Sequence, residues 1–275
     1  MTSTTTDILT RLERYYDAVP RSSARAEDFG PLTLFVPAGS GHPYYARPTL
    51  EWTGAPATAA DVERVRARQR ELGIPEAFEW VPDMTPGLRR ALEETGLAMQ
   101  ERPLMLLEDD GSAAAPHPLV RLLAADDPAL PGALAVPQLA FAELGTAVGA
   151  AGPDELAALI AAQKADGNGS VERVADQIRA GLSVVAAAVE DGTVLCAGQY
   201  RPVSTATATE IVGVGTLPSA RRRGLAVAVT AALAADARAR GIDTVFLTAT
   251  DDAVARVYAR AGFRCIGTAM EASAE

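Results

Sequence analysis

The chain has 275 residues, of which 48% are hydrophobic, and this suffices for one large or two medium-sized domains with a substantial core. Its formal net charge of −10 argues against a nucleic-acid binder that works by neutralising phosphates, whereas an acidic surface suits cationic substrates such as amines. No apolar run could span a membrane and the first residues do not resemble a signal peptide, so we expect a cytoplasmic protein without membrane association.

Cysteine and histidine are scarce, with two of each: Cys196, Cys265, His42 and His117. None of their spacings suits a zinc site. We therefore expect no bound metal and two free thiols rather than a structural disulfide.

The first half of the chain alternates between helical and strand patterns. The expected helices and strands are, in chain order, a helix at 7–19, a strand at 32–36, a helix at 61–72, a strand at 77–81, a helix at 85–95 and a strand at 104–107. Residues 108–118 have the composition of a linker. We therefore predict two domains, 1–110 and 118–275.

The second half contains a longer series of the same kinds of element. The expected strands lie at 119–123, 183–189, 193–201, 207–216, 244–249 and 264–270, and the expected helices at 128–144, 153–164, 170–180, 223–239 and 252–260. Asp191-Gly192 between two strand patterns indicates a β-hairpin. The whole pattern predicts an α/β fold with a mixed central sheet flanked by helices.

Two segments, 70–97 and 239–263, share one order of features: the end of a helix, Gly-Ile, a strand, a helix, and a glycine followed by a hydrophobic residue. This order predicts a tandem repeat of one α/β unit. The first copy is degenerate, because it has no arginine-rich turn and carries Leu92 where the second copy carries Tyr258. The alternative is a chance likeness between short helix–strand segments.

Three consecutive arginines, Arg221, Arg222 and Arg223, stand where a predicted strand gives way to a predicted helix. Positive charges at a helix N-terminus oppose the helix dipole, which costs stability unless an anion binds there. Gly224 has no side chain, so backbone N–H groups can approach a phosphate closely. The turn therefore predicts a site for a nucleotide-like polyphosphate, although a solvated basic face would have the same composition.

Two motifs in this region follow one another: Arg221-x-x-Gly224-x-Ala226, and Ala255-Arg-Val-Tyr258-Ala-Arg-Ala-Gly262-Phe263. With these motifs, residues 210–267 resemble the GNAT superfamily of acyl-CoA-dependent N-acetyltransferases. The resemblance implies a GNAT fold and acetyl-CoA as co-substrate. It also implies transfer of the acetyl group to the amine of a small molecule or peptide, by direct attack within a ternary complex.

The resemblance also implies which residues bind coenzyme A. Backbone amides from Arg222 to Ala226 would surround the pyrophosphate, with Arg221 at its edge, and the free edge of the strand Val212–Thr216 would bind the pantetheine arm. The implied coenzyme-binding residues are Val214, Gly215, Thr216, Arg221, Arg222, Arg223, Gly224, Leu225, Ala226 and Asp251. The glycines fit close backbone approach, but they could also simply weaken the strand.

Three polar residues carry the implied chemistry or depart from it. Tyr258 would donate a proton to the departing thiolate, unless it is an ordinary core tyrosine. Glu210 matches a general-base glutamate of some family members, although an exposed glutamate or a water chain would also fit. Asp251 replaces a coenzyme-contacting asparagine of many members, and an acid suits a helix cap better than a neighbouring phosphate.

A second class of function stays open on the sequence alone. The chain could be a catalytically inactive coenzyme A sensor or scaffold, against which the intact turn and Tyr258 argue. The sequence does not reveal the acceptor amine, and it is compatible with a homodimer without predicting one.

Overall fold

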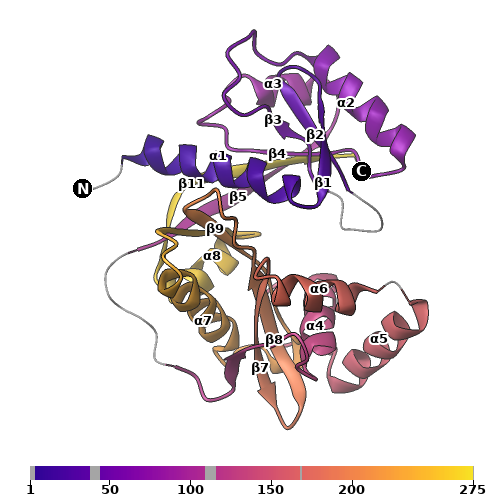
Figure 1. Ribbon diagram of the computed structural model, residues 1–275, viewed down its shortest axis with the longest axis vertical. Helices are drawn as coiled ribbons and strands as arrows, with labels where there is room; N and C mark the ends of the chain where they lie inside the picture. The colour runs from indigo at the N-terminus through magenta and orange to yellow at the C-terminus, as the bar shows by residue number, and fades with distance from the viewer. Residues whose placement is uncertain (1–3, 38–43, 109–115, 168, 275) are drawn as a thin grey trace. The chain divides into compact units, whose positions relative to one another are not determined.

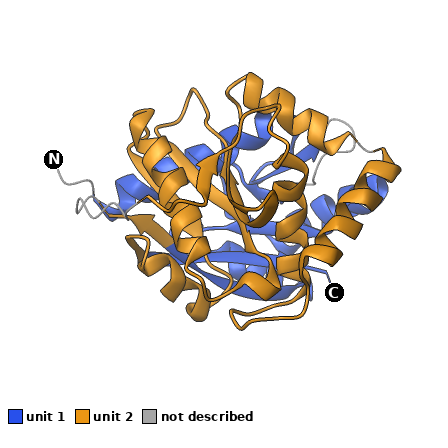
Figure 2. Ribbon diagram, turned by 90° about the horizontal axis from the view of Figure 1, so that it is seen from below, with its two compact units in different colours: residues 1–104, 266–275 blue, residues 105–265 orange. Residues whose placement is uncertain are grey.

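The structure is a computed structural model that describes residues 4–37, 44–108, 116–167 and 169–274 (Figure 1). The chain divides into two compact units, coloured separately in Figure 2. Unit 1 comprises Met1–Leu104 with Ile266–Glu275, and unit 2 comprises Met105–Cys265. The C-terminal segment therefore groups with unit 1, unlike in the expected domain 118–275. Most of the expected linker lies outside the described residues, and the two-domain assignment stays a prediction.

Unit 1 combines helices with a small antiparallel sheet. Its elements are α1 (Thr5–Arg21), β1 (Ala24–Asp28), β2 (Leu32–Pro37), β3 (Arg47–Pro48), α2 (Ala59–Leu72), β4 (Ala77–Trp80), α3 (Leu88–Glu93), most of β5 (Ala98–Leu107) and the end of β11 (Phe263–Ser273). Strands β1, β2 and β3 form a sheet in that order. Capping boxes begin two of the helices, with Thr4 and Asp7 at α1 and Thr58 and Asp61 at α2.

Strands β1 and β3 were not expected from the sequence. Strand β1 has the sequence Ala-Arg-Ala-Glu-Asp and buries no side chain, so it lacks the apolar alternation that indicates a strand. It forms because its backbone pairs with β2, with Ala26 opposite Phe35. Pairing between segments is a tertiary interaction, which explains why local pattern missed it.

Unit 2 is built on a larger mixed sheet with the strand order β11-β5-β10-β9-β8-β7-β6. Its elements are β6 (Val120–Leu122), α4 (Leu130–Ala142), α5 (Pro153–Asp166), α6 (Ser170–Arg179), β7 (Val184–Glu190), β8 (Thr193–Tyr200), β9 (Ala208–Thr216), the 3₁₀-helix η1 (Pro218–Ala220), α7 (Leu225–Ala239), β10 (Thr244–Thr248) and α8 (Asp252–Ala259), with the adjoining ends of β5 and β11. The expected hairpin is confirmed, because Asp191 and Gly192 between β7 and β8 both have positive φ, at 49° and 80°. None of the described helices has the length and apolarity needed to cross a bilayer.

Helices α4 and α7 cover opposite faces of the unit 2 sheet (Figure 1). Gly215 of β9 faces α4, since a Cβ there would lie 2.6 Å from the Cα of Pro137. Gly198 of β8 faces α7, since a Cβ there would lie 3.3 Å from Leu233. Ala197 pairs with Gly215, and successive side chains along a strand alternate between faces, so positions 198 and 215 lie on opposite faces. The mixed α/β fold with flanking helices is thus confirmed.

The element order of the expected repeat is also found, as α2–β4–α3–β5 and α7–β10–α8–β11. Each copy contributes its last strand to the sheet of the other. In unit 1 the end of β11 pairs antiparallel with β4, with Met270 opposite Trp80. In unit 2 the end of β5 lies beside β10. Unit 1 therefore contains backbone from both ends of the chain, whereas unit 2 is one continuous segment.

Candidate active site

The parallel strands β9 and β10 separate partway along their length. Their ladder runs from Ala208 opposite Thr244 to Glu210 opposite Phe246. Strand β9 then continues to Thr216 while paired with β8 on its other edge. Within the described residues, the β10-facing edge of Ile211–Thr216 therefore has no ladder partner. A strand edge of this kind can hydrogen-bond an extended ligand as an added strand would.

A β-bulge reshapes β9 at the start of this open edge. The pairing with β8 shifts register so that Gly213 and Val214 together face Gly198. Gly213 has φ of 63°, a conformation that glycine adopts without a steric penalty. Bulges redirect backbone and side-chain groups and often occur beside active sites. The bulge thus turns the backbone amides of β9 within the stretch where the strand lacks a second partner.

The turn after β9 has the geometry of an anion site. Arg222 and Gly224 both have left-handed backbone conformations, with φ of 68° and 77°. Positive φ is uncommon for a residue other than glycine, so Arg222 marks a backbone held in shape by its surroundings. Alternating backbone conformations point successive N–H groups into one concavity that suits anions.

Helix α7 begins at this turn, two residues later than the sequence predicted. No side chain among the described residues caps it, and its first turn contains no acidic residue. Its N-terminal N–H groups and the positive end of its dipole therefore face the turn without a protein anion. Leu225 and Ala226 supply the first of these N–H groups.

The three arginines have three different environments. Arg221 is 9% exposed, and its guanidinium donates to the carbonyl oxygens of Ala140, Glu143 and Ala147 at 2.9, 2.6 and 3.2 Å. Its side chain thus anchors the segment that follows α4. Arg223 is exposed and forms an ion pair with Glu190 at 2.7 Å. Of the three, Arg222 alone is exposed without a described side-chain partner, so it is the arginine best placed to meet a ligand.

The segment after α4 also binds the turn through its backbone. The N–H of Gly149 donates to the carbonyl of Pro218 at 3.0 Å, and the N–H of Ser219 donates to the carbonyl of Ala151 at 3.0 Å. Together with the bonds of Arg221, these contacts hold η1 and the following residues in place. The segment 143–151 was not expected to support the site, because nothing in its own composition indicates that role.

Tyr258 lies on α8 and is 8% exposed. Its hydroxyl makes no hydrogen bond within the described part of the chain. Burial raises the pKa of Tyr258 above its ordinary value, and the neighbouring Cys196 adds to the shift. The phenol is therefore protonated at neutral pH and can act as a proton donor.

Cys196 and Thr216 lie beside this tyrosine, at opposed positions of β8 and β9. The hydroxyl of Thr216 donates to the sulfur of Cys196 at 3.3 Å. Burial raises the pKa of the Cys196 thiol to about 12, an effect that the hydrogen bond from Thr216 partly offsets. Cys196 is therefore a neutral thiol at neutral pH.

Glu210 and Asp251 each have a structural partner. The hydroxyl of Thr248 on β10 donates to the Glu210 carboxylate at 3.3 Å, at the point where β9 and β10 separate. Thr248 was not among the expected site residues. The Asp251 carboxylate accepts a hydrogen bond from the N–H of Val254 at 2.8 Å and caps α8, which is the role expected of an acid at this position.

Within the described residues, no group of three His, Cys, Asp or Glu side chains is arranged as a metal site.

Comparisons with known proteins agree with this geometry. Residues 156–263 match the model of the acetyltransferase (GNAT) family. A GCN5-related N-acetyltransferase from Kribbella flavida has a similar structure, with a TM-score of 0.65, 22% identity, and coverage of 97% of this chain and 95% of that chain. A search of curated proteins returned no match.

Two further solved structures share the fold over most of the chain. A GCN5-related N-acetyltransferase from Sphaerobacter thermophilus has a TM-score of 0.54 and 14% identity, covering 90% of this chain and 81% of that one. A tandem GNAT protein from the clavulanic acid biosynthesis pathway has a TM-score of 0.53 and 17% identity, covering 89% of this chain and 78% of that one. At these identities the similarity shows the fold alone.

Proposed function

Because residues 156–263 form a domain of the acetyltransferase (GNAT) family, we propose that this protein transfers an acetyl group from acetyl-CoA to an amine. One observation carries the proposal: the open edge of β9 leads directly into the uncapped N-terminus of α7. The pantetheine arm of the coenzyme would bind along the strand edge, and the pyrophosphate that follows it would bind at the helix N-terminus. The acceptor is the amine of a small molecule or peptide.

The coenzyme fits the residues that are present. N–H groups from Arg222 to Ala226 would hold the pyrophosphate, and the exposed Arg222 would add charge-assisted hydrogen bonds. The edge of β9 at Val214, Gly215 and Thr216 would bind the pantetheine arm. Arg221 supports this site as a positioning residue, because its guanidinium is engaged by the carbonyls after α4. Asp251 contributes through the cap that begins α8.

The proposed chemistry is direct attack of the amine on the thioester carbonyl. A C–N bond forms, the C–S bond breaks, and the amine loses a proton while the leaving sulfur gains one. Backbone N–H groups of β9 would stabilise the charge that develops on the carbonyl oxygen. Tyr258 would donate the proton to the sulfur, and Glu210 would accept the proton of the amine. Holding the two reactants together would supply much of the rate.

The test is to incubate the protein with acetyl-CoA and a panel of amines and to measure thiol release and acetylated product. The Tyr258→Phe variant separates an enzyme from an inactive binding module. We expect it to lower kcat by about 10²-fold or more while coenzyme A binding, measured by calorimetry, stays unchanged. Tyr200→Phe is the matched control, since the Tyr200 hydroxyl bonds Asp236 of α7 and has no proposed role in transfer.

Failure of every amine to release thiol, with coenzyme A still bound, would favour a sensor or scaffold instead. Glu210→Gln tests the base separately, because the amide keeps the shape of the side chain and cannot accept the proton. We expect a loss of about 10²-fold in kcat that shrinks as pH rises and more of the amine is already neutral. An unchanged rate would assign the proton to water.

A further inference from the structure

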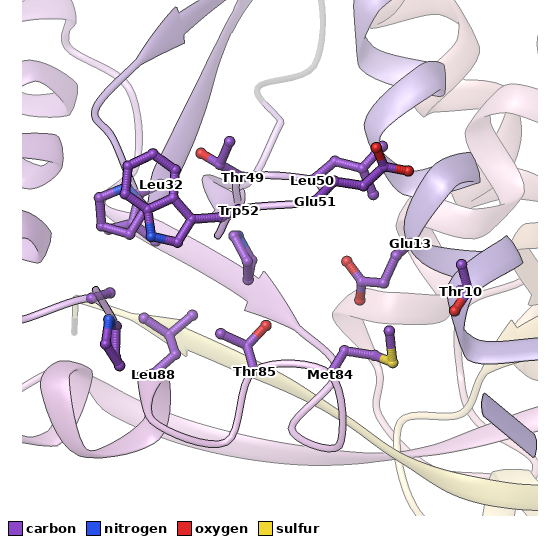
Figure 3. Close-up of a pocket in the computed structure, with 14 residues that line it drawn as sticks. Thr10, Glu13, Leu32, Thr49, Leu50, Glu51, Trp52, Met84, Thr85 and Leu88 are labelled. Carbon is purple, nitrogen blue, oxygen red and sulfur yellow. The ribbon is translucent and has the colours of Figure 1, made fainter. Parts of the chain in front are cut away.

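Unit 1 contains a cavity of its own, with a volume of about 360 Å³. Helix α1 forms one side through Glu13, and the segments around Trp52 and Met84 form others (Figure 3). The volume lies at the lower end of the range of small-molecule sites. All of its lining residues belong to unit 1, so it shares no residue with the proposed acetyl-transfer site of unit 2.

Glu13 places a carboxyl group in this cavity. Its side chain comes from α1 and points toward the cavity in Figure 3. Glu13 is 9% exposed, and its Oε1 is buried without a hydrogen-bond partner in the described part of the chain. A backbone hydrogen bond from Val81 serves the carboxyl group but leaves Oε1 unsatisfied. An unpaired buried acceptor is costly, so its presence beside a cavity indicates a missing donor.

The charges around Glu13 are unbalanced. Arg47 is the nearby cation, but it forms an ion pair with Glu79. Its guanidinium carbon also lies over the ring of Tyr16, 3.6 Å from the ring centroid. Glu13 and Glu79 thus share one guanidinium. Burial and the Glu79 charge both raise the pKa of Glu13, so the ionised form is disfavoured in the protein by itself. A cation next to Oε1 would reverse that effect.

Apolar and aromatic side chains form another part of the cavity wall. The indole N–H of Trp52 donates to the carbonyl of Ala55 at 2.8 Å, which fixes the ring at the cavity wall. Met84 and Leu88 add apolar surface. Glu51, which precedes the tryptophan, has a strained backbone with φ of 56°. Strain of this kind in non-glycine residues concentrates at ligand sites.

We propose that unit 1 binds a small organic ammonium compound, whose cationic head meets Glu13 and whose apolar body packs against Trp52, Met84 and Leu88. This is a binding site separate from that of the acetyl acceptor. A neutral alcohol of the same shape could also donate to Oε1, but it would bring no charge to the carboxylate. The preference for an ammonium head is therefore the property to measure.

The test titrates the full chain with three probes that share a phenyl body: 2-phenylethylamine, 2-phenylethanol and 3-phenylpropionate. The tryptophan fluorescence reports on unit 1, because the two tryptophans are Trp52 at the cavity and the fully buried Trp80. We expect saturable binding of the amine, at least about tenfold weaker binding of the alcohol, and no binding of the carboxylate. Trp52→Phe should remove the fluorescence change.

The Glu13→Gln variant should abolish the preference for the amine over the alcohol. Two controls should retain the preference. The first is Glu94→Gln, at an exposed carboxylate that pairs with Arg90 and does not line the cavity. The second is Glu210→Gln, which excludes the acetyl-acceptor site of unit 2 as the source of the signal.

Equal affinity for amine and alcohol, or the absence of saturable binding by the amine, would overturn the proposal. So would a preference that survives in a folded Glu13→Gln variant. If that variant does not fold, the comparison of the three probes on the unmodified protein decides the question by itself.

Discussion

The guanidinium of Arg221 donates a hydrogen bond to the main-chain carbonyl of Glu143 at 2.6 Å. The first arginine of the proposed coenzyme-binding motif thus points into the protein, toward the segment that follows α4. Its neighbour Arg222 is exposed, with φ of 68°. Adjacent arginines of one motif therefore have separable roles, one in shaping the turn and the other in meeting the ligand.

Substituting Arg221 should mainly lower stability, whereas substituting Arg222 should mainly weaken coenzyme A binding. Arg221→Gln leaves one buried and two partly buried carbonyls without their donor and should lower the free energy of unfolding by about 3 kcal/mol. Arg222→Gln should change stability by less than about 0.5 kcal/mol but weaken coenzyme A binding about tenfold. Chemical denaturation and calorimetry measure the two effects. A stable Arg221→Gln variant with weakened binding would show that Arg221 also contacts the coenzyme.

Gly215 should tolerate no side chain, for a reason that lies in packing. A Cβ at this position would approach the Cα of Pro137 to 2.6 Å and the Cβ of Ala140 to 3.0 Å. We expect Gly215→Ala to lower the free energy of unfolding by about 1–3 kcal/mol through overpacking of α4 on the sheet. Gly87→Ala is the control, since its nearest contact would be an ordinary 3.5 Å. Unfolding curves that coincide for both variants would contradict the packing of α4.

Tyr258 should not limit the pH range of the reaction. Because burial raises the pKa of Tyr258, the phenol keeps its proton at and above its ordinary pKa of 10.0. The rate should rise with pH as the acceptor amine deprotonates and then stay level up to about pH 10. The measurement is the pH profile of kcat for the unmodified enzyme. A decline between about pH 7 and 9 that disappears in Tyr258→Phe would show that the pKa is lowered instead.

Glu13 should make the protein less stable as the pH rises. Its pKa in the folded state is raised above the ordinary 4.5, so folding favours the protonated form. The stability that protonated Glu13 contributes to the folded state is therefore fully present below pH 4.5 and is lost as the pH rises above that value. Glu13→Gln should match the unmodified protein in Tm near pH 4 and exceed it near pH 7, an expectation that thermal denaturation checks. A difference in Tm between Glu13→Gln and the unmodified protein that stays constant at all pH values would contradict the raised pKa of Glu13.

The two cysteines should differ in reactivity. Cys196 is buried and its pKa is raised to about 12, whereas Cys265 is exposed. A thiol reagent at about pH 8 should modify Cys265 quickly and Cys196 only after unfolding. Cys265→Ser should leave no fast-reacting thiol and is therefore the background of choice for thiol-release assays. Rapid modification of the Cys265→Ser variant would mean that β8 opens in the native state.

Residues close together in the sequence predicted much of the local structure of the proposed acetyl-transfer region. The strand, turn and helix around Arg221–Ala226 were expected in this order and are found, because glycines, arginines and apolar periodicity act within a few residues. The hairpin at Asp191-Gly192 was found for the same reason. The bulge of β9 at Gly213 was not expected, because the glycines of this strand were interpreted as allowing close backbone approach or as weakening the strand.

Other features had no local signal. Strand β1 forms by pairing, Thr248 reaches Glu210 from another strand, and the segment 143–151 supports the turn through carbonyl groups that every residue possesses. Gly215 makes room for α4, a packing role that its neighbours in the sequence did not indicate, while its expected contact with a ligand stays a prediction. The cavity of unit 1 was not expected at all, because its lining residues come from segments scattered between Thr10 and Leu88.

The sequence by itself therefore predicted the α/β fold class and most of the order of helices and strands, because backbone preferences and glycine placement are properties of short segments. Folding alone settled which partners the residues of these segments meet. Met270 of β11 lies opposite Trp80 of β4, a pairing of segments far apart in the sequence that depends on long-range packing. The direction of the Arg221 side chain and the burial of Glu13 have the same origin, because both depend on residues that are distant in the sequence.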